Sequence, residues 1–186
     1  MYYKFRDLKN YKYILDIFLN QRLFSSSFRN LNDNFEGQFF HMLESDELKR
    51  WRLNPQKEEH LSVCSFTKNC KSHLLWSHYS DGHRGIAIGF TINESIYKVE
   101  KVEYNGLKNF TEFPNKPEDL KSIFLNKIKD WKYEDEYRII TKNPDYINIE
   151  IKKVIFGAET PLHDKEMITK LVNLISNNIE IDTYYD

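Results

Sequence analysis

An acidic and aromatic stretch in the last third of the chain holds the residues best suited to chemistry. It reads DWKYEDEYRII, residues 130–140, and places Glu134, Glu136 and Arg138 at alternate positions. In an extended strand these three side chains share one face and apolar neighbours occupy the other. In a helix, Glu134 and Arg138 instead form an ion pair one turn apart.

Two interpretations of this charged face stay open. In the first, it is an ordinary solvated face whose charges pair across strands, each pair stabilising the sheet by a few tenths of a kcal/mol. In the second, Glu134 and Glu136 are catalytic carboxylates directed into a cleft, and Arg138 orients Glu136 and keeps it ionised.

A second group of candidates lies in CSFTKNCKSHLLWSHYSDGHRGIAIGF, residues 64–90. Trp76 and Tyr79 are three residues apart and share a helix face, where such aromatics fill a core or stack on a flat ligand ring. Ser65 and Thr67 lie on the preceding strand, and their hydroxyls are available as hydrogen-bond donors to a ligand.

The same segment holds two cysteines and three histidines, which raises the question of a zinc site. Their spacing follows no compact ligand pattern, such as C-x₂-C followed by a second pair, so we expect no metal. We interpret the histidines near the turn as hydrogen-bonded structural residues. The residues concerned are Cys64, Cys70, His73, His78 and His83.

Two further clusters each have a structural and a functional interpretation. In NLNDNFEG, residues 30–37, Asp33 suits a turn and Glu36 is either a loop brace or a metal ligand or base. Near the amino terminus, Arg6 either holds a phosphate in a bidentate contact or pairs with an acid on a neighbouring strand.

Composition bounds the protein class. With 186 residues, 40% hydrophobic and 15% aromatic, the chain is expected to form a single ordered domain, residues 1–186. A net charge of −1 argues against a protein that coats nucleic acid or an anionic membrane, although a local basic patch stays open. Two cysteines do not make a disulfide scaffold, and no signal peptide or membrane-spanning run is visible, so we expect a cytoplasmic protein.

The hydrophobic pattern predicts an α+β fold with a mixed or largely antiparallel sheet and about five flanking helices. Helices are predicted over residues 11–20, 38–51, 72–80 and 117–130, and one after Pro161. Strands are predicted over residues 2–6, 23–25, 61–67, 84–92, 97–104, 137–141, 147–156 and 179–185. We expect the strand over 97–104 to neighbour that over 84–92.

Helix faces and ends are also predicted. The first helix should bury Ile14, Leu15, Phe18 and Leu19. The last should be capped by Thr160 and begin at Pro161. Its expected inward residues are Leu162, Met167, Ile168, Leu171 and Ile175.

Six short blocks, in this order, resemble an uncharacterised bacterial domain family known only as a domain of unknown function. The family pattern is KYR, FNDPFE, CFS, WxHYxxxHxG, WxYExExR and a strand ending in FG. The matching blocks here are KFR (4–6), LNDNFE (31–36), CSF (64–66), WSHYSDGHRG (76–85), WKYEDEYR (131–138) and VIFG (154–157). Asn34 stands where the family has proline, and CSF differs in order from CFS.

A more distant similarity is to ADP-ribosyltransferase-like domains, which carry an early arginine or histidine, a Ser/Thr-bearing middle strand and a late glutamate. Arg6, then Ser65 or Thr67, then Glu134 and Glu136 follow that order. The resemblance implies an ADP-ribosyltransferase-like fold and NAD as substrate.

This similarity also implies residue roles. Glu136 would stabilise the positive charge that builds on the ribose when the nicotinamide bond breaks. Glu134 would hold an acceptor group, Arg6 the pyrophosphate, and Trp76 or Tyr79 the nicotinamide ring.

Three functions therefore remain. The first is an NAD-consuming transferase or glycohydrolase, of the kind found in bacterial toxins and phage-defence effectors, binding a small nucleotide and using a protein or nucleic-acid acceptor. The second is a non-catalytic interaction or ligand-sensing module, in which the E-x-E-x-R strand is an internal ion-pair network. The third is a metal-dependent phosphodiesterase, which requires four acids to converge: Asp33, Glu36, Glu134 and Glu136.

Overall fold

The computed structural model describes residues 1–54, 61–143 and 145–184, and it has an α+β fold with mixed sheets. The described chain divides into two compact units, each assembled from separate segments. The first unit contains residues 1–23, 65–97 and 146–184, and the second contains 24–54, 61–64, 98–143 and 145. The expectation of a single domain stays a prediction.

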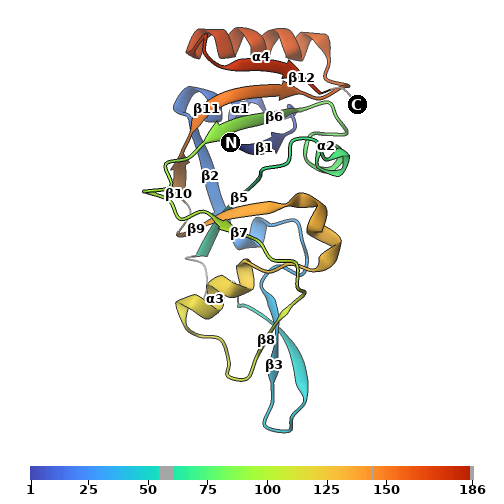
Figure 1. Ribbon diagram of the computed structural model, residues 1–186, viewed down its shortest axis with the longest axis vertical. Coiled ribbons are helices and arrows are strands. Elements are labelled where there is room, and N and C mark those ends of the chain that lie inside the picture. Colours follow the sequence, from blue (N-terminus) through green and yellow to red (C-terminus); the bar gives the residue numbers. More distant parts are fainter. Residues whose placement is uncertain (55–60, 144, 185–186) are drawn as a thin grey trace. The chain divides into compact units, whose positions relative to one another are not determined.

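The first unit is built on a hydrophobic central strand. β6 (Ile86–Thr91) pairs antiparallel with β1 (Tyr2–Arg6) on one side and with β11 (Glu150–Phe156) on the other. β12 (Glu180–Thr183) pairs parallel with β11, as Figure 1 shows. The helices of this unit are α1 (Tyr11–Asn20), α2 (His73–Tyr79) and α4 (Leu162–Ile175). Residues 86–90 of β6 are all buried, which is expected of a strand covered on both faces.

The second unit contains two groups of strands. In the first group, β2 (Arg22–Ser27, in this unit from Phe24 on) pairs antiparallel with β5 (Leu61–Thr67, in this unit up to Cys64), and β9 (Glu136–Lys142) pairs with β5 and with β7 (Glu100–Lys101). In the second, β3 (Gln38–Met42) lies between β4 (Leu48–Arg52) and β8 (Lys108–Phe110). The remaining elements are η1 (Phe28–Asn30), α3 (Pro117–Phe124) and η2 (Lys129–Glu134), and β10 (Asp145–Asn148) begins where this unit ends.

An apolar core joins the elements of the second unit. It gathers side chains from η1, β3, β5 and α3, and the residue that follows β4 adds to it. The members are Phe28, Phe39, Leu53, Val63, Leu120, Ile123 and Phe124. Because α3 contributes three of them, the carboxyl end of that helix is fixed inside the unit.

The predicted helix over residues 38–51 is wrong, because this segment is the β3–β4 hairpin. The Leu43 N–H donates to the Glu47 carbonyl at 2.9 Å, and Asp46 adopts a left-handed φ of 58°. An aspartate tolerates that conformation, and it closes a short turn. Aromatic residues at 39 and 40 favour a strand, where alternate side chains reach the core.

Other element boundaries also differ from the prediction. α3 ends at Phe124 rather than near residue 130, and the predicted strand over 97–104 is reduced to β7, which pairs with β9 and not with β6. The strand over 147–156 is divided into β10 and β11. Of the predicted last strand, residue 185 lies outside the described residues.

Two helix faces were predicted correctly only in part: Ile14, Phe18 and Ile168 are buried as expected, but other members are not. In α1, Leu15 and Leu19 are exposed, and Ile17 is buried beside Ile14 and Phe18. In α4, the predicted inward residues Leu162 and Met167 are exposed, whereas Ile168 and Val172 are buried.

The start of α4 differs as well. Pro161 is its cap, and Thr160 donates its hydroxyl to the Gly85 carbonyl instead of capping the helix. The predicted strands over 2–6 and 61–67 and the helix over 11–20 are confirmed at both ends. Among the helices of the described residues, none is long and apolar enough to cross a membrane.

Candidate functional site: a buried charge cluster

Five charged side chains meet inside the second unit, and we call them the charge cluster. Its acids are Glu36, Glu134 and Glu136, and its cations are Lys127 and Arg138. Every one of these side chains is at most 7% exposed. Buried charges are tolerated only when they are paired and hydrogen-bonded, and this cluster meets both conditions.

Arg138 lies at the centre of the cluster and donates to three groups. Its Nε and Nη2 contact the two Glu136 oxygens at 2.7 and 3.0 Å. Its Nη1 contacts Glu36 Oε2 at 3.0 Å, while its Nη2 bonds to Glu36 Oε1. Nη1 also donates to the Phe124 carbonyl at 2.6 Å, at the end of α3 where helix carbonyls lack partners.

Lys127 is the second cation of the cluster. Its Nζ lies 2.6 Å from Glu134 Oε2, 3.0 Å from Glu136 Oε2 and 3.7 Å from Glu36 Oε1. The Trp131 ring covers the ammonium group at 4.9 Å, a cation–π geometry. Lys127 thus contacts all three acids of the cluster.

Local backbone structure explains how residues so far apart in sequence converge. The Asp33 carboxylate accepts the Phe35 N–H at 2.8 Å, and its carbonyl accepts the Glu36 N–H at 3.0 Å. Gly37 then turns the chain with a φ of 74°, a conformation that favours glycine. This turn directs Glu36 to Arg138, so Asp33 positions the loop and Glu36 joins the cluster.

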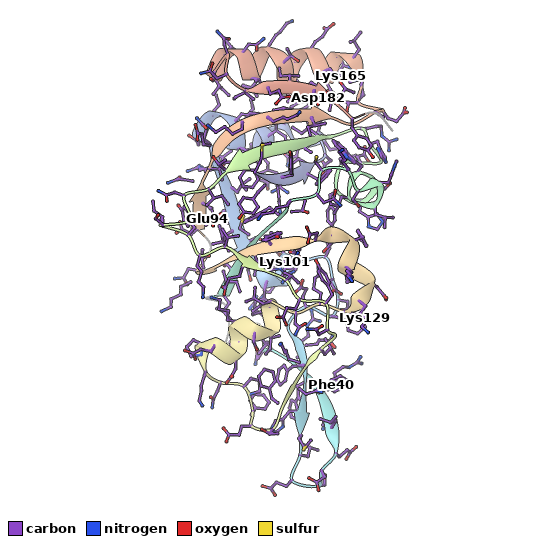
Figure 2. The ribbon with its side chains drawn as sticks, viewed as in Figure 1. Phe40, Glu94, Lys101, Lys129, Lys165 and Asp182 are labelled. Carbon is purple, nitrogen blue, oxygen red and sulfur yellow. The ribbon has the colours of Figure 1, made fainter. Side chains whose placement is uncertain are left out.

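The E-x-E-x-R segment changes conformation within its first three residues. Glu134 ends η2, Asp135 adopts a left-handed φ of 41°, and Glu136 begins β9. Lys101, a residue of β7 that Figure 2 labels, forms a salt bridge with Asp135: its Nζ lies 2.7 Å from Asp135 Oδ1. Because Asp135 is left-handed, Glu134 and Glu136 on either side of it both reach Lys127.

Two backbone hydrogen bonds fix the position of Lys127. Its N–H donates to the Glu103 carbonyl at 2.8 Å, and its carbonyl accepts the Gly106 N–H at 3.0 Å. The Glu136 N–H in turn donates to the Tyr104 hydroxyl at 2.8 Å. The segment over residues 103–106 therefore fixes both Lys127 and Glu136.

The charges of the cluster determine how its groups titrate. Burial alone would lower the pKa of Lys127, but Glu136, Glu134 and Glu36 raise it above its usual value. The pKa of Arg138 is likewise raised, against the effect of burial, by Glu136 and Glu36. Burial and the charges of Glu136 and Glu134 raise the pKa of Tyr104, which stays neutral. Both cations are therefore fully charged at neutral pH.

This geometry corrects one sequence prediction. The charged face of residues 134–138 is not solvated, because Glu134, Glu136 and Arg138 are all buried. Glu136 and Arg138 are extended, as one alternative required, whereas Glu134 belongs to the preceding turn. Both carboxylate oxygens of Glu136 contact cations, so the side chain acts in the structure as an ion-pair partner.

Three of the four acids required by the phosphodiesterase hypothesis, Glu36, Glu134 and Glu136, do converge. They converge on Lys127 and Arg138, however, and the two cations occupy the positions between the carboxylates. In the part of the chain that the structure describes, no group of three or more His, Cys, Asp or Glu residues is arranged to hold a metal ion.

The other predicted site residues belong to the first unit and are not members of the charge cluster: Arg6, Ser65, Thr67, Trp76 and Tyr79. Thr67 accepts the Asn69 N–H at 2.9 Å and so stabilises the turn after β5. The Ser65 hydroxyl is buried without a hydrogen-bond partner among the described residues. Arg6 contacts the Phe5 carbonyl at 3.3 Å, and Tyr79 is half-buried at the end of α2.

Trp76 is a core residue. It is fully buried, its ring lies edge-on to Phe5 at 4.9 Å, and its indole N–H donates to the Cys70 carbonyl at 2.9 Å. Tyr184 also stacks on the Trp76 ring, with the ring centroids 5.1 Å apart. The convergence of Arg6, Trp76 and Glu136 on one ligand stays a prediction.

Lys127 is the member of the cluster that sequence reasoning missed. It lies in a lysine-rich stretch, LNKIKDWKYED, in which nothing distinguishes the buried lysine from its exposed neighbours. The available signal was the excess of acids over cations around Arg138, because three buried glutamates require more than one positive charge.

Residues 75–139 match the family model described as Protein of unknown function (DUF2971). No curated protein and no solved structure matches the chain. The matched segment runs from α2 to β9 and includes four members of the charge cluster, all except Glu36. The resemblance to an uncharacterised domain family is thus confirmed, and over residues 75–139 the chain is similar to that family of unknown function.

Proposed function

We propose that the protein is a non-catalytic interaction module whose second unit is held together by the charge cluster. The observation that carries this proposal is the pairing of Glu136. Its two oxygens lie within 3.0 Å of Arg138 and Lys127, and the side chain is 7% exposed.

The role of a catalytic carboxylate explains these contacts less well. Such a group needs at least one oxygen directed at the reacting atoms. To reach a substrate, Glu136 would have to leave two cations in a buried site, and the cost of separating buried partners is about 3–5 kcal/mol. A network that joins η2, β9, the 33–37 turn and the end of α3 is explained directly as a structural brace.

The test compares Glu136→Gln with Glu134→Gln. Both substitutions remove one negative charge, but Glu136 bridges both cations whereas Glu134 binds Lys127. We expect Glu136→Gln to lower the free energy of unfolding by several kcal/mol and Glu134→Gln by less. Unchanged urea midpoints for Glu136→Gln would contradict a structural role.

The second candidate is the NAD-consuming enzyme. It is favoured by the excess of carboxylates, three against two cations, because an uncompensated negative charge would stabilise an oxocarbenium-like ribose. Half-buried Trp131 and Tyr133 lie beside the cluster with ring centroids 5.9 Å apart, and such rings suit a nicotinamide or adenine. Turnover of NAD by the wild type that Glu136→Gln abolishes, with its stability unchanged, would establish this candidate and overturn the first.

A further inference from the structure

The β4–β3–β8 sheet has two unlike faces. Cross-strand partners point to the same side of a sheet, so Phe39, opposite Trp51, and His41, opposite Lys49, share one face. Phe113 packs over this face, with ring centroids 5.6 Å from Phe39 and 5.5 Å from Trp51. We call it the covered face.

The opposite side we call the outer face, defined by Phe40, Arg50 and Arg52. Phe40 follows the buried Phe39 in β3 and so points away from the core, and it pairs directly with Arg50. Arg52 lies two residues further along β4, about 7 Å from Arg50, on the same side. Figure 2 labels Phe40 on this sheet.

The outer face is basic and its arginines are available. The three strands read QFFHM, LKRWR and KNF, without an aspartate or glutamate. Both arginines are exposed, and no salt bridge joins Arg50 or Arg52 to an acid in the described part of the chain. The acids of the hairpin, Glu44, Asp46 and Glu47, lie in the turn beyond the strands.

We propose that the outer face binds single-stranded nucleic acid. An aromatic ring flanked by guanidinium groups on an open sheet offers a stacking surface for one base and charge-assisted contacts to the adjoining phosphates. A duplex offers phosphates to the arginines but no unstacked base to Phe40, because its bases are already stacked on one another. The inference rests on the proposed interaction module and names the class of its partner.

Charge complementarity commits the surface to this occupant. Two cations, Arg50 and Arg52, lie on the outer face, and its three strands carry no aspartate or glutamate, in a protein whose net charge is −1. An anionic polymer that also presents flat rings matches both features, whereas an acidic peptide would use only the arginines. The patch is small, so we expect contacts to two phosphates and one base.

The test is fluorescence anisotropy with a labelled mixed-sequence single strand, as RNA and as DNA, and with the corresponding DNA duplex. Arg50→Ala removes a charge from the outer face, and the matched control Lys49→Ala removes one from the covered face of the same strand. We expect Arg50→Ala to weaken binding of the single strand about tenfold and Lys49→Ala less than about twofold. Phe40→Leu, which keeps an apolar side chain, should weaken binding by at least about fivefold, as expected for the loss of one stacked base.

Salt dependence gives a second readout. Two phosphate contacts predict a slope of log K against log salt of about −1.4 for the wild type and about −0.7 for Arg50→Ala. Tighter binding of either the RNA or the DNA single strand supports the proposal and identifies the polymer.

Three results would overturn it: no binding by the wild type, equal binding of the duplex, or equal losses in Arg50→Ala and Lys49→Ala. These results leave the role of the charge cluster intact. Conversely, NAD turnover dependent on Glu136 would overturn the interaction module without changing the binding comparison.

Discussion

Replacing Lys127 with methionine tests whether the charge cluster stabilises the second unit. The substitution keeps an unbranched side chain, one atom shorter, and removes the ammonium group, which contacts three buried carboxylates. Arg138 would then be the one cation left in the cluster beside three acids. The excess negative charge would rise from one to two in a site from which water is almost excluded.

The magnitude follows from the distances. At an effective dielectric constant of about 20, each contact near 3 Å contributes about 6 kcal/mol of Coulomb attraction before the cost of removing both ions from water is subtracted. Net losses on removing one partner from a buried pair are about 3–5 kcal/mol. For a chain of this length, at about 2–4 °C per kcal/mol, that corresponds to a fall in Tm of about 6–20 °C.

The matched control is Lys101→Met, in the same unit. Lys101 lies 2.7 Å from Asp135, but these side chains are 57% and 38% exposed. Solvent screening limits an exposed pair to less than about 1 kcal/mol. Urea unfolding followed by circular dichroism measures both variants, and a loss for Lys127→Met no greater than that for Lys101→Met would refute the reasoning.

Three further predictions concern pH, bidentate pairing and close packing. The pKa of Lys127 is raised in the folded state, so its contribution to stability is complete below about pH 10.5 and is lost as the pH rises through the folded pKa. The difference in unfolding free energy between wild type and Lys127→Met should therefore shrink under strongly alkaline conditions. A difference that stays constant with pH would contradict this prediction. Arg138→Lys keeps the charge but cannot reach both Glu36 and Glu136 with paired donors. We expect the free energy of unfolding measured in urea to fall by at least about 2 kcal/mol. A variant as stable as the wild type would show that charge alone suffices. Gly157→Ala would place a Cβ 2.1 Å from the His83 carbonyl oxygen, whereas the Cβ of Gly106→Ala would meet nothing within 4 Å and would be strained only by the φ of +89°. We expect the free energy of unfolding, measured by thermal unfolding, to fall by about 3 kcal/mol for Gly157→Ala and by about 1 kcal/mol for Gly106→Ala. Equal losses would exclude the close contact as the cause.

Sequence reasoning reached the elements whose patterns are local. The strand YYKFR and the helix YKYILDIFLN were predicted at their observed ends because the apolar periodicity of each is contained within the segment itself. The hairpin over 38–52 was missed since it depends on a left-handed Asp46 and on Phe39 reaching a distant core, and neither is visible in a window of a few residues. Local pattern therefore predicted element type better than it predicted pairing.

The same distinction applies to the site. The sequence analysis singled out the E-x-E-x-R motif, but whether its face is solvated or buried depends on Glu36, about one hundred positions earlier in the chain. Long-range ion pairs leave no periodic signal, and a lysine that will be buried resembles one that will not. Phe40 and Arg50 were missed for a related reason, because a predicted helix does not pair them across two strands.

The central claim is that Glu136 stabilises the fold through its two cations, and the free energy of unfolding of Glu136→Gln tests it most directly. The account predicts a loss of several kcal/mol relative to wild type, larger than the loss for Glu134→Gln measured under the same conditions. A Glu136→Gln protein as stable as the wild type would contradict the account, whatever its activity toward NAD.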